Sequence, residues 1–318
     1  MNKKINIGIT IGDPSGIGPE VVVKSLENFK QPKDSLIYIF GDEVALIKNR
    51  LRKNKDKIKL VDLKQIKNLE FKFGLISKKF GKASLAYLKE AVSFLKRGEI
   101  DCLVTAPVNK EAINLGNIKF SGHTEFLASA FGVKNTVMMF VSDKLKLSLV
   151  TRHMALNKVS RYLNKNTIFN TLTLTHHALK YYLGIKKPKI VVLGLNPHAS
   201  EDGLMGNEEE RVIEPAIMEF SKISKSIYGP FPPDTVFRRV LDNEFDAAIC
   251  MYHDQGLIPF KIFSFNNGVN LTLGLPFIRT SCVHGTAFEI AGKNKADYHS
   301  MLEAMKLAYR LTKNKLER

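Results

Sequence analysis

The chain has 318 residues, of which 44% are hydrophobic and 25% are charged, and its formal net charge is +17. This is the composition of a globular protein that is long enough for two lobes or one large α/β unit. No apolar run approaches the roughly 18 residues of a membrane span, and the opening MNKKINIGIT lacks the apolar block of a signal peptide, so we expect a cytoplasmic protein without membrane contact.

The apolar runs predict seven strands, separated by amphipathic stretches in the alternation typical of α/β proteins. We expect the strands at residues 5–12, 36–41, 102–107, 136–142, 146–151, 189–195 and 247–252. We expect helices at residues 20–29, 83–98, 166–184 and 207–222. No internal repeat or linker is visible, which favours a two-lobed unit. The three cysteines are widely separated and lie beside apolar residues, which predicts buried free thiols at Cys102, Cys250 and Cys282.

The basic tract at residues 48–67 raises the question of nucleic acid. It contains no aromatic residue for base stacking, and apolar residues recur between its lysines: Leu51, Ile58, Leu60, Val61, Leu63 and Ile66. We interpret it as a solvated face over a packed stripe and expect no nucleic-acid partner. The positive charge could still attract small anionic substrates.

Three motifs in the first half of the chain leave a structural and a functional interpretation open. GDPSGIGPE (residues 12–20) is either a turn or an anion-binding loop, and it matches neither a P-loop nor a dinucleotide fingerprint. TAPVNK (105–110) and SGHTEFLA (121–128) place polar groups after a strand or at a helix start. His123 and Thr124 suit a phosphate or a carboxylate, but residue type alone favours Thr124 as a helix cap.

Three histidines follow three of the expected strands within one to three residues. They are His153, His198 and His253. Singly, each would be an ordinary loop residue. Together they predict a catalytic divalent metal, because three imidazoles at strand ends can converge and suit zinc, cobalt, nickel or iron better than calcium.

Further polar residues surround these histidines in the sequence. Asp234 lies in PPDTVF and Asp254 in HDQG, and Lys261, Asn270 and Arg279 follow at intervals of nine. The last three would suit a doubly anionic substrate. Lys261 and Arg279 stand among apolar residues, so each is expected to have a partner.

Seven motifs in order, from residue 12 to 281, closely resemble the 4-hydroxythreonine-4-phosphate dehydrogenases of vitamin B6 synthesis. They are GDPSGIGPE, TAPVNK, GHTEFLA, NPHASEDGLMGNEE, GPFPPDTVF, YHDQGLIPFK and NLTLGLPFIRTS. The resemblance implies an α/β/α fold like that of the isocitrate and isopropylmalate dehydrogenases, and a homodimer with shared active sites. The expected lobes are 1–120 with 295–318, and 121–294, with the active site in the cleft between them.

The same resemblance assigns roles to residues. The metal ligands would be His153, His198 and His253, with His153 reaching the partner's metal, which could be zinc, magnesium, cobalt or manganese. The substrate-binding residues would be His123, Thr124, Lys261, Asn270 and Arg279. Asp234 and Asp254 would orient other groups or act as acid and base.

VHGTAFEIAGK (residues 283–293) is similar to the adenine-side loop of the isopropylmalate dehydrogenases. NAD or NADP would therefore contact His284, Gly285, Thr286 and Ala287. Val283 departs from the family, which usually has an aspartate there, and this leaves the choice of dinucleotide open.

The implied reaction is the NAD(P)-dependent oxidation of 4-phosphohydroxy-L-threonine to 2-amino-3-oxo-4-phosphohydroxybutanoate, which decarboxylates to 3-amino-2-oxopropyl phosphate. One alternative is a paralogous dehydrogenase of phospho-threonate or phospho-erythronate. A more distant alternative is a metal-dependent phosphohydrolase, which would need no dinucleotide.

Overall fold

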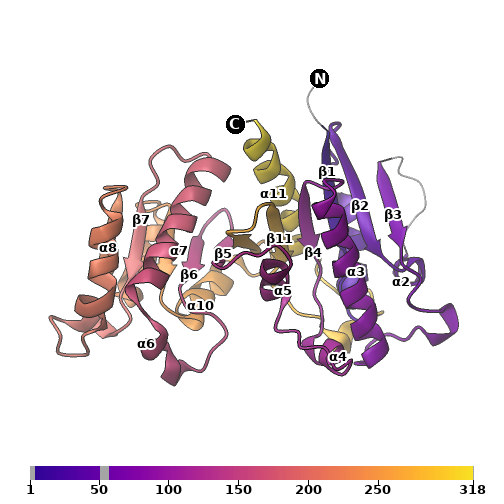
Figure 1. The fold of residues 1–318 in the computed structure, drawn as a ribbon, viewed down its shortest axis with the longest axis horizontal. Helices are drawn as coiled ribbons and strands as arrows, with labels where there is room; N and C mark the ends of the chain where they lie inside the picture. The colour runs from indigo at the N-terminus through magenta and orange to yellow at the C-terminus, as the bar shows by residue number, and fades with distance from the viewer. Residues whose placement is uncertain (1–3, 51–56, 318) are drawn as a thin grey trace. The chain divides into compact units, whose positions relative to one another are not determined.

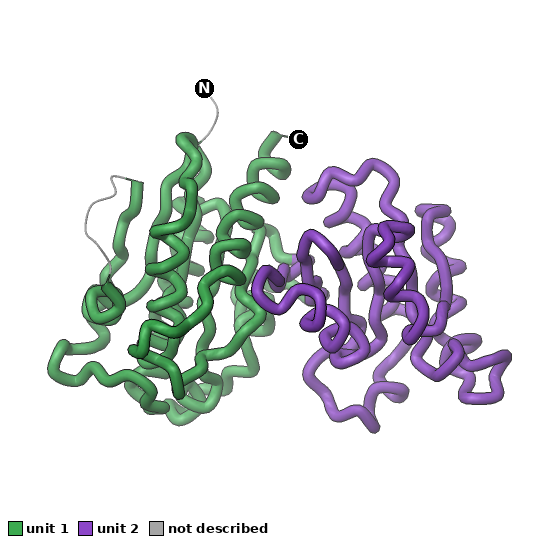
Figure 2. Tube along the Cα trace, turned by 180° about the vertical axis from the view of Figure 1, so that it is seen from behind, with its two compact units in different colours: residues 1–134, 275–318 green, residues 135–274 purple. Residues whose placement is uncertain are grey.

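The computed structural model of the protein describes residues 4–50 and 57–317. It divides into two compact units, unit 1 with Met1–Lys134 and Leu275–Arg318, and unit 2 with Asn135–Gly274 (Figure 2). Segments 121–134 and 275–294 belong to unit 1, although the sequence assigned them to the second lobe. The reason is long-range pairing, since strand β11 (Ile278–Cys282) pairs with β4 (Cys102–Thr105).

Unit 1 is built on five parallel strands in the order β3-β2-β1-β4-β11 (Figure 1). The strands not yet given are β1 (Ile5–Thr10), β2 (Ser35–Gly41) and β3 (Ile58–Asp62). Every residue of β4 and β11 is buried, as in sheets that helices cover on both faces. Helix α11 packs along β4 and β11 and against α1, and α3 packs on β1 and β2.

The helices of unit 1 begin after strands and carry several of the motifs. They are α1 (Gly18–Asn28), α2 (Glu43–Lys48), α3 (Lys78–Lys96), α4 (Lys110–Asn114), α5 (His123–Ala130) and α11 (His299–Leu316). Short 3-10 turns occur at η1 (Asn68–Glu70) and η6 (Phe288–Ile290). Helix α3 starts earlier than expected, because Ser77 caps it by accepting the Phe80 N–H at 3.3 Å.

Unit 2 has a mixed sheet in the order β10-β5-β6-β9-β7-β8. Its strands are β5 (Val137–Val141), β6 (Lys146–Leu149), β7 (Ile190–Leu193), β8 (Ile227–Phe231), β9 (Ala247–Cys250) and β10 (Val269–Leu273). Strand β5 is antiparallel to β10 and β6, whereas β6, β9, β7 and β8 are mutually parallel. The carboxyl ends of β6, β9 and β7 therefore meet at one edge.

The helices of unit 2 pack against this sheet and against each other. They are α6 (Val159–Tyr162), α7 (Lys165–His177), α8 (Glu214–Phe220), α9 (Pro233–Leu241) and α10 (His253–Ser264). Short 3-10 turns occur at η2 (Leu156–Lys158) and η4 (Pro197–Ser200), and π-helical turns occur at η3 (Ala178–Tyr182) and η5 (Glu209–Ile213). Helices α7 and α8 pack together, and α10 lies against β6 and β9.

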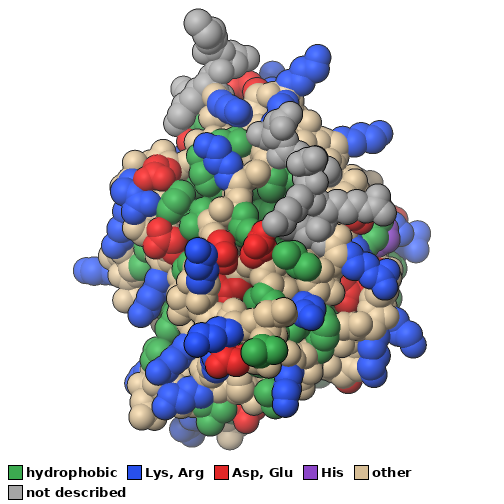
Figure 3. Space-filling model, turned by 90° about the vertical axis from the view of Figure 1, so that its right-hand side faces the viewer, with side chains coloured by type: hydrophobic (Ala, Val, Ile, Leu, Met, Phe, Trp, Pro, Cys, Tyr) green, Lys and Arg blue, Asp and Glu red, His purple; other side chains and the backbone are tan. Residues whose placement is uncertain are grey.

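The seven expected strands are confirmed, and three free buried cysteines agree with the sequence analysis. In the basic tract, Leu51 lies outside the described residues, Ile66 is buried, and Ile58, Leu60 and Val61 form part of the edge strand β3. On the face of unit 1 in Figure 3, lysine and arginine side chains are scattered among acidic ones and do not form one patch. None of the helices within residues 4–50 and 57–317 is long and apolar enough to span a membrane.

Candidate active site

The stretch YHDQG lies where β9 ends and α10 begins, and its buried Gln255 ties strand ends together. Gln255 Oε1 accepts the Met251 N–H at 2.7 Å, and Nε2 donates to the Gly194 carbonyl after β7 at 2.7 Å. Thr151, which follows β6, donates to the Met251 carbonyl from its N–H at 3.1 Å and from Oγ1 at 2.7 Å. The loops after β6, β9 and β7 therefore start side by side, and each carries one predicted ligand.

His153 and His253 approach each other within one chain, with ring centroids 5.6 Å apart. Two imidazoles bound to one zinc at about 2.0 Å place their centroids roughly 5 Å apart, so this pair fits two ligands of a divalent metal. His253 Nδ1 lies 2.6 Å from Asp254 Oδ1, which leaves Nε2 for the metal and is the orienting contact that metal-bound histidines usually make. This closeness of the two rings within one chain differs from the expectation that His153 binds the metal of the partner subunit.

His198 lies in a strained loop that follows β7. From His198 to Asp202, five consecutive residues with side chains have φ between 45° and 78°. Such left-handed residues each cost roughly 1–2 kcal/mol. Buried Glu209 holds the loop, because Oε1 accepts the N–H groups of Leu195 and Asn196 at 2.7 and 2.8 Å, and Oε2 accepts Asn196 Nδ2 at 2.8 Å. Strain held in this way is typical of functional sites.

Within the described ranges, no three His, Cys, Asp or Glu side chains form a ready metal site. The structure brings together two of the three predicted ligands, His153 and His253, and places His198 on a neighbouring strand end.

We expect Glu209→Ala to release the loop that carries His198 and to weaken the affinity for zinc or cobalt by about tenfold or more. Isothermal titration of metal-free protein with each ion measures this effect. Glu210→Ala, which removes an exposed neighbouring carboxylate, is the matched control and should bind as the wild type does. An unchanged dissociation constant in Glu209→Ala would show that this clamp does not serve metal binding.

The other site residues of unit 2 lie on three elements. Asp234 is exposed in the first turn of α9, which packs against η4 and so lies near the turn that holds His198. Asn270 lies on β10, and its buried Oδ1 has no hydrogen-bond partner among the described residues, which suits a ligand contact. Lys261 is exposed, so the expectation that it needs a buried partner is wrong. Phe260 takes the inward position of α10 and Lys261 the outward one.

Arg279 is the central cation of the candidate site in unit 1. It lies on β11, is buried, and its Nη2 donates to Thr105 Oγ1 at 2.6 Å, so the partner expected from the sequence is present. Burial lowers the pKa of Arg279 to about 10, which leaves the guanidinium charged near neutral pH. The carboxylate of Glu125 also acts on this guanidinium.

His123 begins α5, and its buried Nε2 has no hydrogen-bond partner among the described residues. Burial, and then the charges of Arg279 and Lys110, hold the pKa of His123 well below its usual range, so the imidazole is neutral. Thr124 is buried in the first turn of α5, and the cap position is Gly122. The cap interpretation of Thr124 is therefore wrong, which leaves its hydroxyl for the predicted ligand role.

The GDPSG stretch forms a tight turn around buried Asp13. Gly12 has φ of 72°, and a β-carbon there would lie 2.1 Å from the Pro107 carbonyl oxygen. Asp13 Oδ1 accepts the Ser15 N–H at 3.0 Å, and Oδ2 has no partner among the described residues. A buried carboxylate at this position opposes an anion, so the structure favours the turn over the phosphate loop.

Burial raises the pKa of Asp13 from 3.8 to about 6, despite the hydrogen bond from Ser15. Folding therefore favours the protonated carboxyl, and the associated stability is present below pH 3.8 and is lost as the pH rises through about 6. The difference of about 2 pH units corresponds to about 3 kcal/mol. We expect Asp13→Asn to reduce the loss of thermal stability between pH 4 and pH 7. An equal loss in variant and wild type would contradict this assignment.

The predicted cofactor loop follows β11 and packs on the GDPSG turn. The Thr286 carbonyl accepts the Ile17 N–H at 2.9 Å. His284 Nε2 is buried without a hydrogen-bond partner among the described residues, and no atom lies within 4 Å of the β-carbon position of Gly285. An unsatisfied imidazole nitrogen beside open backbone fits contacts to a dinucleotide.

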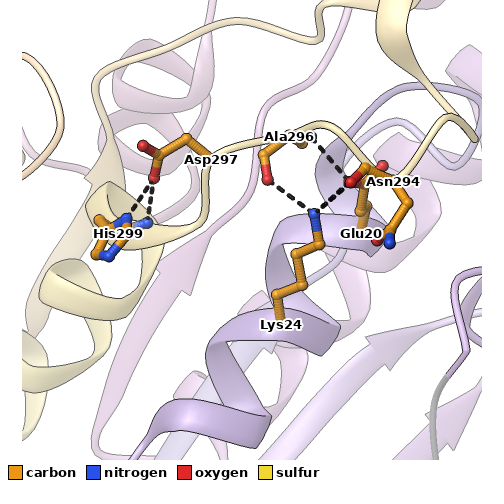
Figure 4. Close-up of polar contacts among 6 residues, drawn as sticks. All are labelled: Glu20, Lys24, Asn294, Ala296, Asp297 and His299. Atoms are coloured by element: carbon orange, nitrogen blue, oxygen red, sulfur yellow. Dashed lines mark hydrogen bonds and ion pairs between the residues drawn. The ribbon is translucent and has the colours of Figure 1, made fainter.

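The far end of this loop is fixed to α1 (Figure 4). Buried Glu20 accepts the Ala296 N–H at 2.9 Å and Lys24 Nζ at 2.7 Å through the same oxygen, Oε1. Lys24 Nζ also donates to the carbonyls of Asn294 and Ala296 at 3.1 and 2.9 Å. The GPE end of the first motif therefore holds the end of the predicted cofactor loop in place.

Residues 19–308 match the family model described as "Pyridoxal phosphate biosynthetic protein PdxA". The chain belongs to the PdxA family. The 4-hydroxythreonine-4-phosphate dehydrogenase of Sulfurihydrogenibium sp. (strain YO3AOP1) is 42% identical over an alignment of 318 positions, gaps included. The alignment covers 96% of this chain and 97% of the relative. A putative D-threonate 4-phosphate dehydrogenase of Oceanobacillus iheyensis is 40% identical, covering 99% of this chain and 100% of the relative.

Solved structures show the same relationship. The 4-hydroxythreonine-4-phosphate dehydrogenase of Klebsiella pneumoniae aligns with a TM-score of 0.84 at 32% identity, over 98% of this PdxA-family chain and 100% of that one. A β-decarboxylating dehydrogenase from Thermococcus kodakarensis aligns with a TM-score of 0.52 at 13% identity, over 96% of this chain and 83% of that one. The expected likeness to the decarboxylating dehydrogenases is thus confirmed at the level of fold.

Sequence reasoning did not assign three residues that shape these sites. Glu209 is the last residue of NPHASEDGLMGNEE and Gln255 lies within YHDQGLIPFK, and the sequence did not show that both side chains are buried. Lys110 closes the TAPVNK motif, and its position after a strand was the available signal.

Proposed function

We propose that this PdxA-family protein oxidises 4-phosphohydroxy-L-threonine with NAD or NADP, using a divalent metal, to 2-amino-3-oxo-4-phosphohydroxybutanoate, which decarboxylates to 3-amino-2-oxopropyl phosphate. Full-length similarity to dehydrogenases of this name supports the activity. The structural observation that carries the proposal is the His153–His253 pair, with Asp254 orienting one ring.

The residues of the chain bind and orient the substrate. Arg279 would hold an anionic group, while His123 donates or accepts one hydrogen bond as a neutral imidazole. Asn270 Oδ1 would accept from an ammonium or hydroxyl group, and Lys261 would add a flexible cation. A bound metal would supply polarisation of the substrate hydroxyl and stabilisation of negative charge on oxygen, and a bound nicotinamide would supply a hydride acceptor.

The metal ligands and the cofactor loop complete the proposal. His153, His198 and His253 would hold zinc, magnesium, cobalt or manganese, with Asp254 orienting His253 and Asp234 acting beside His198 as an orienting group or as acid and base. His284, Gly285, Thr286 and Ala287 would contact the dinucleotide.

A homodimer with shared active sites forms part of the proposal, and the surface of α10 supports it. Four large apolar side chains on this helix and its end are exposed: Ile258 (59%), Ile262 (71%), Phe263 (43%) and Phe265 (66%). Exposed apolar groups gathered on one element are typical of an interface. Because the same helix begins with His253, a second copy that covers it would lie beside the histidine pair.

One alternative is a paralogous dehydrogenase of phospho-threonate or phospho-erythronate, which the D-threonate 4-phosphate relatives favour. These substrates carry a hydroxyl where 4-phosphohydroxy-threonine carries an amine. One hydrogen-bonding group at that position can change kcat/KM by orders of magnitude.

The test measures reduced nicotinamide by absorbance, with purified protein, a divalent metal and each phosphorylated substrate in turn. We expect the highest kcat/KM with 4-phosphohydroxy-L-threonine. A higher value with phospho-threonate or phospho-erythronate would establish the paralogous activity. Phosphate release without a dinucleotide would reject both dehydrogenase functions and establish a metal-dependent phosphohydrolase.

Val283 offers a test of the cofactor loop, since its N–H donates to Ser300 Oγ at 3.0 Å and its side chain is half-buried. We expect Val283→Asp to lower the KM for NAD or NADP by an amount equivalent to one hydrogen bond, roughly 0.5–3 kcal/mol. Val283→Asn is the uncharged control. If neither dinucleotide shows a changed KM, the side chain at this position does not face the cofactor.

A further inference from the structure

We propose that Lys110 is a substrate-positioning residue, which binds a phosphate group together with His123 and Arg279 in unit 1. This inference rests on the proposed function and deepens it by adding a third group to the anion site. Lys110 is the first residue of α4, and Asn109 fixes that start because its side chain accepts the Ala112 N–H at 2.7 Å. The backbone of Lys110 is thereby held while its long side chain remains exposed.

The Lys110 ammonium lies close to the start of α5. A β-carbon at Gly122 would stand 3.6 Å from Lys110 Cε, 3.7 Å from Nζ and 2.8 Å from Glu125 Oε2. A side chain at this position would crowd the lysine and the carboxylate, whereas glycine leaves room for both beside the start of α5. The positive charge of Lys110 also acts on the imidazole. Burial, and then the charges of Arg279 and Lys110, lower the pKa of His123.

The net positive charge of this group suits an anion such as phosphate. Arg279 and Lys110 contribute two positive charges, and Glu125 contributes one negative charge that acts on Arg279. The buried Nε2 of neutral His123 lacks a hydrogen-bond partner among the described residues, and a phosphate oxygen or hydroxyl would supply one. Arginine supplies fixed geometry and lysine a mobile point charge, a combination that suits a tetrahedral anion.

The test uses inorganic phosphate as the probe, so it does not depend on turnover. Phosphate binding is measured by calorimetry, and the His123 pKa by NMR, for the wild type and for Lys110→Gln, Lys110→Arg and Lys119→Gln. Lys119 is an exposed lysine between α4 and α5, so its variant removes the same charge nearby. Retained amide spectra confirm that each variant is folded.

We expect Lys110→Gln to weaken phosphate binding by at least about tenfold and to raise the pKa of His123 in the free protein. Lys110→Arg should retain most of the affinity, and Lys119→Gln should behave as the wild type does. With phosphorylated substrate, Lys110→Gln should raise KM more than it lowers kcat, as expected when binding to an unreacting group is lost.

Unchanged phosphate affinity in Lys110→Gln would overturn the inference even if the protein is an active dehydrogenase. An equal weakening of acetate binding would also overturn it, because the site would then serve a carboxylate. Conversely, Lys110-dependent phosphate binding in a protein without dehydrogenase activity would support the inference and reject the proposed function.

Discussion

Removal of divalent metal is expected to lower kcat by at least about 10³-fold, because several kcal/mol of charge stabilisation on the substrate oxygen would be lost. The fold should remain, since His153 and His198 are exposed and His253 is only half-buried, so none of them belongs to the core. Activity after chelation and dialysis, with circular dichroism on the same samples, measures both effects.

Adding back zinc, cobalt, manganese or magnesium should restore turnover to different degrees, because the ions differ in preferred ligands and geometry. His253→Ala is the matched variant, and its activity should stay low whatever metal is added. Full turnover in protein shown to contain no metal would reject metal catalysis and leave the family assignment standing.

Subunits with different histidine defects are expected to complement each other. His153→Ala and His198→Ala chains, each inactive alone, should recover about a quarter of wild-type activity when mixed and exchanged. About half of the randomly paired dimers are mixed, and in each of these one site carries both defects and the other carries none. The physical basis would be the proposed shared metal site, with the exposed apolar face of α10 beside His253 as the proposed contact.

A second mixture identifies the histidine that crosses the interface. His153→Ala with His253→Ala should remain inactive, because these rings lie 5.6 Å apart in one chain and every site would keep one defect. Recovery in both mixtures would mean that His153 serves the partner's metal, as the sequence resemblance implied, and recovery in the second mixture alone would mean that His253 does. If neither mixture recovers after proven exchange, each chain supplies all its own ligands.

The family and the order of the main strands could be predicted from local sequence. Apolar runs mark β1, β2, β4, β5, β6, β7 and β9, since a strand that is buried on both faces carries apolar side chains on both. The sequence missed β3, β8, β10 and β11, whose residues are half-buried or interrupted by polar groups such as Asn270 and Arg279. Local pattern cannot identify strands whose character depends on distant partners.

By itself, the sequence determined the PdxA-family membership, the α/β class and the position of three histidines after strands, because these depend on residues that are close in the chain. Only the tertiary structure decided that His153 and His253 meet, since β6 and β9 become neighbours through a parallel pairing of distant segments. It also decided that Lys261 is exposed and that Lys110 lies beside the start of α5. Burial and charge proximity arise from the packing of distant segments, and that information is absent from any short stretch of sequence.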